Sequence, residues 1–339
     1  MYFQGKKILI IGGTGTIGQM LFKELLNHDV DVIRILSRDE YKQFEMENFL
    51  DKKYRPRTRF LIGDVRDYDR VERAMSGIDI VFNLAAMKHV PACEYNPTEA
   101  IKTNVTGMEN VINAAIKNNV ECVMFTSSDK AINPTNTYGA TKMLAEKLVQ
   151  AANYSKGQVR TKFVAVRFGN VMGSRGSVVP LFKNQILEQG RITITDPKMS
   201  RFMMTPGQAV KLIIKSCEIS VGGELFILKM PVLKLDELAQ VIVEEVKKKY
   251  NVQKKVKIDI IGLRAGERLH EELMTIEESQ YAKDLGDMYS VIPTTFNSDF
   301  YRKVYNKYKS CEIGSYSSND VRVMEKEKIR EFILEENLI

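Results

Sequence analysis

The sequence predicts an α/β protein: a doubly wound parallel sheet with a smaller, mixed α/β lobe. Three observations favour this fold class. A short β-branched run at 6–11 is followed at once by a glycine cluster and then by a helical pattern at 20–26. Strand and helix patterns then alternate to about residue 170, which is typical of a parallel sheet with helices on both faces. Beyond that point the alternation ends, so a second lobe is expected there.

Short apolar runs mark the predicted strands of the first half. After the opening strand they lie at 32–36, 59–62, 79–84, 122–126 and 163–167. Helical periodicity fills most of the gaps, most clearly at 104–118. In the second half, a loop of small residues precedes three helical patterns, at 180–189, 206–219 and 235–250. The run 223–228 is predicted to return to the first sheet as a strand, and 294–319 to be a wrapping or flexible segment.

The predicted boundaries follow from these patterns. Residues 1–5 resemble the remnant of a cleaved expression tag, and we expect them to lie outside the fold. Residues 6–170 are predicted to form a nucleotide-binding domain, with 205–230 returning to it. Residues 171–339 are predicted to form the second lobe and a C-terminal wrap.

Composition excludes several classes of protein. No apolar run approaches the roughly 18 residues of a membrane span, so we expect a cytoplasmic protein without a membrane partner. The four cysteines are far apart and unpatterned, which predicts neither a disulfide framework nor a metal site. The net charge of +7 is scattered through helices, so nucleic acid is not expected as a partner. An anionic substrate and cofactor explain a basic cleft equally well, and solvated lysines explain most of the charge.

The glycine cluster at 12–18 has the spacing of a dinucleotide-binding fingerprint. Glycine allows a tight turn, close approach of the backbone to a pyrophosphate, and close packing of helix on strand. The N-terminus of the following helix favours the phosphates' negative charge. The position between a strand and a helix favours a Rossmann fold over an ordinary turn. The predicted cofactor-binding residues of this loop are Gly12, Thr14, Gly15, Thr16, Ile17 and Gly18.

Further cofactor contacts are predicted where the next strands end. Ser37, Arg38 and Asp39 follow the second strand, where a Rossmann fold meets the adenosine ribose. An acidic residue alone would favour a free 2′-hydroxyl, but Arg38 is able to pair with a 2′-phosphate, so NADP is predicted over NAD. Past the third and fourth strands, the predicted contacts to adenine and to the ribose and phosphates are Asp64 and Val65, then Ala85 and Ala86.

Serines end the fifth strand, and a tyrosine and a lysine follow. Tyr138 and Lys142 are four residues apart and share a helix face. A nearby ammonium and a cationic nicotinamide both favour the phenolate, which allows a tyrosine to act as a base. Such a pair is common by chance on helices, but it is much more specific after a glycine fingerprint and a strand ending at Ser128, and both residues are also predicted to bind the cofactor.

With these residues placed, the sequence resembles the extended short-chain dehydrogenases/reductases, specifically the UDP-N-acetylglucosamine 4,6-dehydratase family of polysaccharide and pseudaminic acid biosynthesis. The resemblance covers nearly the whole chain. Its motifs are Ser37-Arg38-Asp39-Glu40, Gln43-Phe44-Glu45-Met46, Ala85-Ala86-Met87-Lys88-His89-Val90-Pro91, Glu94-Tyr95-Asn96-Pro97, Ser128-Asp129-Lys130-Ala131, 170–178, Arg264-Ala265-Gly266-Glu267 and Ser315-Tyr316-Ser317-Ser318. The Asp-Lys pair is the most discriminating, because deoxythymidine-linked 4,6-dehydratases carry Asp-Glu there.

The resemblance implies a reaction and roles for residues. Tyr138 and Ser128, with Lys142, would serve oxidation at C4. Lys130, if neutral, would remove the C5 proton, and Asp129, if protonated, would donate to the departing 6-hydroxyl. We expect burial and the nicotinamide charge to push both groups toward neutrality. Some family members have methionine in place of the tyrosine, so the C4 base stays open.

The resemblance also implies a UDP-sugar substrate and a homo-oligomer, a dimer or a hexamer. The C5 outcome leans toward inversion. Two alternatives stay open: a UDP-sugar 4-epimerase, and a non-catalytic NADP-sensing protein. The predicted substrate-binding residues are Lys88, Asn170, Arg175, Ser177, Val178, Arg201, Arg264 and Glu267.

Overall fold

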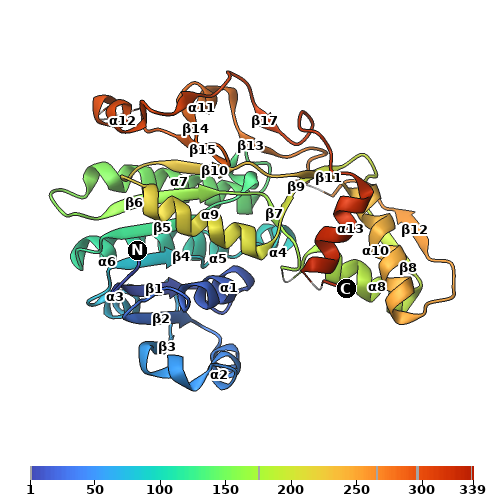
Figure 1. Ribbon diagram of the computed structural model, residues 1–339, viewed down its shortest axis with the longest axis horizontal. Helices are drawn as coiled ribbons and strands as arrows, with labels where there is room; N and C mark the ends of the chain where they lie inside the picture. The colour runs from blue at the N-terminus through green and yellow to red at the C-terminus, as the bar shows by residue number, and fades with distance from the viewer. Residues whose placement is uncertain (1, 175, 265, 295–297, 337) are drawn as a thin grey trace.

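A ten-stranded sheet forms the centre of the computed structural model, which describes residues 2–174, 176–264, 266–294, 298–336 and 338–339 (Figure 1). The strand order is β16-β14-β15-β10-β6-β5-β4-β1-β2-β3, and the strands from β10 to β3 run parallel. The parallel strands are β1 (Lys7–Ile11), β2 (Val32–Ser37), β3 (Thr58–Ile62), β4 (Ile80–Asn83), β5 (Cys122–Thr126), β6 (Lys162–Arg167) and β10 (Leu225–Leu228).

Helices cover both faces of this sheet, which confirms the predicted fold class. One layer packs α1 (Thr16–Leu25) against α9 (Pro206–Ile219). The other layer packs α6 (Gly107–Lys117) against α3 (Tyr68–Met75) and α7 (Thr137–Ser155). The central strands are apolar along their length because both faces are covered, and all residues of β4 and β5 are buried.

The chain reverses its direction of growth at β1. It adds β2 and β3 on one side and then crosses to β4 on the other. Ligands of such sheets bind at the carboxyl ends of the strands on either side of this switch point. The short helices α2 (Glu40–Asn48), α4 (Val90–Tyr95) and α5 (Pro97–Ile101) follow strands β2 and β4.

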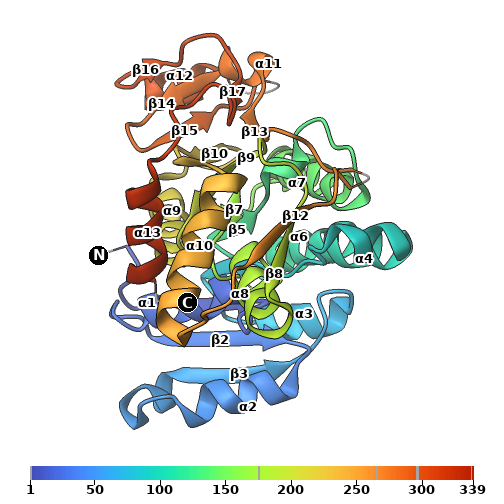
Figure 2. The same ribbon diagram turned by 90° about the vertical axis from the view of Figure 1, so that its right-hand side faces the viewer.

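The second lobe has a hydrophobic core of its own. The parallel pair β8 (Arg191–Ile194) and β12 (Lys257–Ile260) packs with α8 (Val178–Gln189) and α10 (Leu235–Tyr250). Helix α13 (Lys326–Glu335) closes the lobe beside α10 (Figure 2). Buried residues of this core include Phe182, Ile242 and Ile333. A three-stranded sheet lies between the lobes: β7 (Asn170–Val171), β9 (Ser200–Met204) and β11 (Val232–Lys234).

The predicted boundary at residue 170 needs a correction. Strands β14 (Ala282–Asp284), β15 (Met288–Val291) and β16 (Lys309–Ser310) do not belong to the second lobe but extend the large sheet beside β10. They pair antiparallel and are two to four residues long, too short to give a readable pattern. The remaining elements of this region are β13 (Glu272–Met274), α11 (Ile276–Ser279), α12 (Ser298–Tyr305) and β17 (Tyr316–Ser317).

The expectation that residues 1–5 lie outside the fold is also corrected, as far as residues 2–5 are described. Phe3 is fully buried in the main core, edge-on to His28 and beside Phe82. The N–H of Gly5 donates to the carbonyl of Asp29 over 2.7 Å. Burial of an aromatic side chain that precedes a strand lowers the free energy of the folded state, whatever the origin of the segment.

Two further findings concern the predicted absences. Within the described ranges, no helix is both long and apolar enough to cross a bilayer. Cys122 and Cys217 are far apart in sequence, but their Sγ atoms lie 3.7 Å apart in the core as free thiols.

Candidate active site

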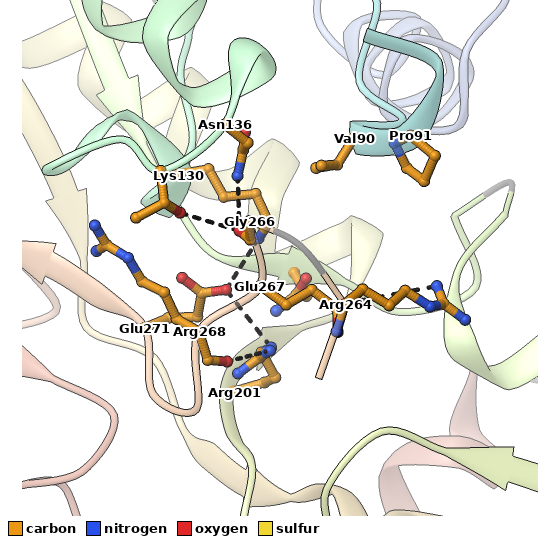
Figure 3. Close-up of a pocket in the computed structure, with 12 residues that line it drawn as sticks. Val90, Pro91, Lys130, Asn136, Arg201, Arg264, Gly266, Glu267, Arg268 and Glu271 are labelled. Carbon is orange, nitrogen blue, oxygen red and sulfur yellow. Dashed lines mark hydrogen bonds and ion pairs between the residues drawn. The ribbon is translucent and has the colours of Figure 1, made fainter. Parts of the chain in front are cut away.

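A continuous cleft of about 1020 Å³ follows the carboxyl ends of the parallel strands and extends to the second lobe. A smaller pocket of about 190 Å³ adjoins it where Lys130 faces Arg264 and residues 266–271 (Figure 3). Together they bring most of the predicted cofactor and substrate residues to one surface.

The glycine loop is shaped for close approach. Gly12 has a φ of +79°, and a Cβ there would lie 2.8 Å from the backbone nitrogen of Ala85. A Cβ on Gly18 would lie 2.6 Å from the Cα of Gly13, so α1 packs directly on the loop. This cradle fits a dinucleotide pyrophosphate at the start of α1. All six predicted loop residues line the cleft.

The end of β2 carries the residues predicted to meet the ribose. Ser37 Oγ lies 2.7 Å from Thr14 Oγ1, which joins the glycine loop to β2. Asp39 caps α2 by accepting from the N–H of Lys42 over 3.1 Å. The Arg38 side chain is 59% exposed, with Nη1 3.6 Å from Asp64 Oδ2. A cation is therefore available beside the cleft at this end.

The loop after β4 is held by a residue that the sequence analysis missed. Asn104 is buried in a short π-helical turn (Lys102–Thr106). Its Oδ1 accepts from the N–H of Met87 over 2.8 Å, and its Nδ2 donates to the Met87 carbonyl and to Thr141 Oγ1, each over 2.9 Å. A π-turn of this kind is frequent at functional sites. Asn104 thereby fixes the loop of Ala85 and Ala86 relative to α7.

The predicted acid–base residues follow β5 directly. Asp129 is 1% exposed, and its Oδ1 accepts from Ser128 Oγ over 2.7 Å and from the backbone N–H of Lys130 over 2.9 Å. The Nζ of Lys130 lies 3.1 Å from the same oxygen. Within the described residues, the second oxygen of Asp129 is buried and has no hydrogen-bond partner. One carboxylate and one amine thus lie in contact at the cleft.

Tyr138 and Lys142 project from the first turns of α7, whose N-cap is Asn136. Burial raises the pKa of Tyr138 to about 12, although the Ser128 hydrogen bond and the charge of Lys130 act in the opposite direction. Lys142 Nζ donates to the carbonyl of Thr126 over 2.8 Å. Burial lowers the pKa of Lys142 to about 8, against the effect of Glu146.

The expectation that Lys130 is driven toward neutrality is corrected for the protein by itself. Burial does lower the pKa of its amine, but the charges of Asp129 and Glu271 outweigh burial and hold that pKa above its ordinary value. Glu271 Oε1 lies 3.3 Å from Lys130 Nζ. The sequence analysis missed Glu271, which is 141 residues from Lys130 in sequence; its one signal is its place shortly after the predicted 264–267 motif.

The predicted diphosphate arginines differ in their surroundings. Arg201 is largely buried, and it donates to the carbonyls of Ser200 over 2.7 Å and of Arg268 over 2.9 Å. It therefore holds the 268–271 segment and also lines the cleft. Arg264 is 53% exposed at the cleft mouth, with Nη1 3.9 Å from Glu267 Oε1. Its guanidinium has room for an incoming anion.

The other predicted substrate residues approach from both lobes. Lys88, Asn170, Ser177 and Val178 all line the cleft, and Ser177 is the N-cap of α8. Arg175 lies outside the described residues.

Comparison with known proteins decides the family. The family model described as "Polysaccharide biosynthesis protein" matches residues 8–293. The chain belongs to the polysaccharide biosynthesis protein family. The resemblance drawn from its motifs is thereby confirmed, because proteins named inverting UDP-N-acetylglucosamine 4,6-dehydratase are also similar to most of the chain. That of Campylobacter jejuni strain 81-176 is 44% identical over 86% of this chain and 84% of its own length.

Other members of the polysaccharide biosynthesis family carry different names. The UDP-glucose 4-epimerase of Rickettsia canadensis is 40% identical over 99% of this chain and 98% of its own length. A Methanocaldococcus jannaschii protein named an uncharacterized membrane protein is 44% identical over 98% of this chain and 97% of its own length. The relatives are therefore named after two different sugar-nucleotide reactions, 4,6-dehydration and 4-epimerisation.

One solved structure shares the whole architecture, and another shares most of the fold. The structure of Pen from Bacillus thuringiensis is 51% identical, with a TM-score of 0.93 and full coverage of both chains. A dTDP-glucose 4,6-dehydratase from Streptomyces venezuelae, solved with NAD, is 20% identical with a TM-score of 0.67 over 78% of this chain and 86% of its own. At that identity the likeness concerns the fold alone. Membership of the family itself implies a nicotinamide cofactor.

Proposed function

We propose that the protein is an NADP-dependent UDP-N-acetylglucosamine 4,6-dehydratase, a hydro-lyase that inverts C5. The observation that carries the proposal is the contact of Lys130 with Asp129 at the cleft, beside Ser128 and Tyr138. An amine and a carboxylate at that point fit removal of one proton and delivery of another. A 4-epimerase needs neither. The similarity to the inverting dehydratases supports the same activity.

The side chains divide the work of the proposed reaction. A bound nicotinamide supplies the hydride acceptor, and later the donor. Tyr138 takes the proton of the C4 hydroxyl, assisted by Ser128, and the cation of Lys142 on the same helix favours the phenolate. The resulting ketone at C4 makes the C5 proton acidic.

Lys130 and Asp129 carry out the elimination. Transfer of one proton from Lys130 Nζ to Asp129, over the 3.1 Å contact, makes the lysine a base and the aspartic acid a donor at once. Lys130 then removes the C5 proton, and Asp129 protonates the departing 6-hydroxyl. Hydride would return from a bound nicotinamide to C6, C5 would then take a solvent-derived proton on the face opposite the one it lost, and water is the only other product.

The substrate's charge explains the cations of the second lobe. Arg264 is exposed at the cleft mouth, and its fork geometry suits a diphosphate. Arg201, Glu267 and Lys88 line the same cleft, on the side expected to hold the nucleotide and the sugar. Asn170, Ser177 and Val178 are assigned to the loop that contacts the sugar nucleotide.

NADP is proposed over NAD on the strength of Arg38. Its side chain lies at the β2 end of the cleft and is mostly exposed, so it is available to a 2′-phosphate. Replacing Arg38 with Ala should weaken NADP binding about tenfold or more, since a charge-assisted contact contributes roughly 1.5–3 kcal/mol. NAD affinity should stay within about threefold, because NAD has no 2′-phosphate. Titration calorimetry with both cofactors checks this, and an equal loss for both would argue against the assignment.

Product analysis in deuterated water tests the activity. The wild-type protein, UDP-N-acetylglucosamine and NADP should give a 4-keto-6-deoxy sugar nucleotide with deuterium at C5, and nuclear magnetic resonance of the fresh product gives the C5 configuration. The Rickettsia relatives favour a UDP-sugar 4-epimerase as the second candidate. An epimerase would eliminate no water and leave C5 unlabelled. A protein that binds NADP without turnover would give no product at all.

The assembly and its place in the cell also belong to this proposal. We expect a homo-oligomer, a dimer or a hexamer, in the cytoplasm, where UDP-sugars are available. Light scattering of the purified protein measures the first, and cell fractionation measures the second.

A further inference from the structure

Glu271 faces the proposed base from the opposite wall of the pocket. Its Oε1 lies 3.3 Å from Lys130 Nζ and 3.6 Å from Arg201 Nε (Figure 3). The residue is 4% exposed, directly before β13. Burying a carboxylate costs free energy, and its pairing with the two cations offsets that cost, so a negative charge is kept beside the Lys130 amine.

The backbone around Glu271 is fixed by a second set of contacts. The N–H of Glu271 donates to Ser318 Oγ over 2.9 Å, and the N–H of Ser318 donates to the Glu271 carbonyl over 2.8 Å. Ser200 Oγ lies 2.8 Å from Ser318 Oγ and 2.7 Å from His270 Nδ1. Two other segments of chain, at Ser200 and Ser318, therefore hold Glu271 in place, and its carboxylate is preorganised toward Lys130.

The proposed reaction sets a requirement on this site. When Lys130 has taken the C5 proton, Asp129 still holds the proton for the departing hydroxyl. For that interval the Asp129–Lys130 pair holds one proton more than before. A neighbouring negative charge favours that proton, because it attracts the ammonium and repels the ionised form of Asp129.

We propose that Glu271 is a positioning residue whose negative charge holds the Lys130 amine at the cleft and favours the doubly protonated Asp129–Lys130 pair. The inference rests on the proposed dehydratase function and deepens it, because it assigns a third charged group to the elimination step. Arg201 on β9 neutralises the other side of Glu271 and joins the second-lobe wall to this step.

The charged and titratable groups facing Lys130 set the expected pH dependence. They are Asp129 beside it, Glu271 before β13, Arg201 on β9 and Tyr138 on α7. Asp129 and Glu271 raise the pKa of Lys130, while Arg201 lowers it. Removing the charge of Glu271 must therefore lower the pH at which the pair loses its proton.

Glu271→Gln tests this role, because glutamine keeps the shape and an oxygen acceptor but not the charge. The matched control is Glu272→Gln, which removes a carboxylate from the next residue in sequence. Each variant is mixed with NADP and UDP-N-acetylglucosamine in deuterated water. Absorbance of the reduced nicotinamide follows C4 oxidation, nuclear magnetic resonance follows deuterium entry at C5, and thermal unfolding shows that both variants fold.

We expect Glu271→Gln to slow C5 exchange about tenfold or more, the effect of one pKa unit, while C4 oxidation stays within about threefold. Reduced nicotinamide should then accumulate, and the alkaline limb of the C5 exchange profile should shift about one unit to lower pH. Glu272→Gln should behave as wild type. C5 exchange at the wild-type rate, or an unmoved alkaline limb, overturns the role of Glu271. Absence of dehydration in the wild type instead overturns the proposed function, so the two failures are distinguishable.

Discussion

Two lysines near the end of β5 have opposite pKa displacements, and the reason is their count of carboxylate neighbours. Lys130 contacts two carboxylates, Asp129 and Glu271, and its pKa rises despite burial. Lys142 donates to a neutral carbonyl, and burial lowers its pKa to about 8. The first is held as a cation by charge, and the second is poised near neutral pH.

The depressed pKa of Lys142 predicts how stability varies with pH. The ordinary value is 10.5 and the folded value about 8, so between them the unfolded chain binds more protons than the folded one. The free energy of unfolding should therefore gain a contribution as pH rises from about 8 to 10.5. Lys142→Met should remove this contribution, seen as a difference between urea unfolding curves of variant and wild type across that range. If the free energies of unfolding of variant and wild type change equally with pH, burial does not lower the pKa of the Lys142 amine.

Lys130→Met separates catalysis from binding at the same strand end. Loss of a general base should lower the dehydration rate about 10²–10⁴-fold. The affinity for the UDP-sugar should change little, because the diphosphate contacts are assigned elsewhere. The melting temperature should fall, since Asp129 and Glu271 lose their shared cation. Product assays check the rate and calorimetry checks the affinity and the melting temperature, and an active variant would remove Lys130 from the mechanism.

At the scale of elements, the site depends on how closely α1 and its loop pack on the sheet. A Cβ on Gly18 would lie 2.6 Å from the backbone of the same loop, whereas a Cβ on Gly207 at the start of α9 would meet nothing closer than 3.7 Å. Gly18→Ala should therefore displace the helix start and weaken NADP binding about tenfold or more, while Gly207→Ala should leave it unchanged. Fluorescence titration of NADP compares them. Equal NADP affinities of the two variants would mean that the glycine loop adjusts to the added methyl group at little cost in free energy.

The elements also show what the sequence was able to predict. The parallel strands were readable because burial on both faces makes them continuous apolar runs, and the ligand residues follow their carboxyl ends. Glu271 was not readable, because its contact with Lys130 depends on tertiary packing and on no periodicity. The role of Asn104 was not predicted for a related reason. It lies within a helical pattern, and its role depends on hydrogen bonds to Met87, which the sequence does not show. Strands β14 to β16 were missed because they are short.

At the scale of the whole molecule, one buried ion cluster joins the catalytic helix to the edge of the large sheet. Arg167 at the end of β6 donates to both oxygens of Glu146 on α7, over 3.0 and 2.6 Å. It also donates to both oxygens of Glu278 on α11, over 2.8 and 3.0 Å. Arg167 and Glu146 are almost fully buried whereas Glu278 is one-quarter exposed, so the contact with Glu146 lies in the interior and the one with Glu278 nearer the surface.

Arg167→Met should be strongly destabilising. It leaves the carboxylates of Glu146 and Glu278 without their cation, and breaking a buried pair costs about 3–5 kcal/mol. Urea unfolding measures the loss, with Arg160→Met, a change at an exposed arginine two residues before β6, as the control. A loss below about 1 kcal/mol would place the cluster among surface-like ion pairs.

Side chains near both ends of the described chain are buried. Phe3 lies in the main hydrophobic core, and Ile339 lies in the core of the second lobe, where its carbonyl accepts from Lys249. Surface immobilisation of the protein is therefore better made through an exposed loop, because attachment there leaves both buried side chains in place.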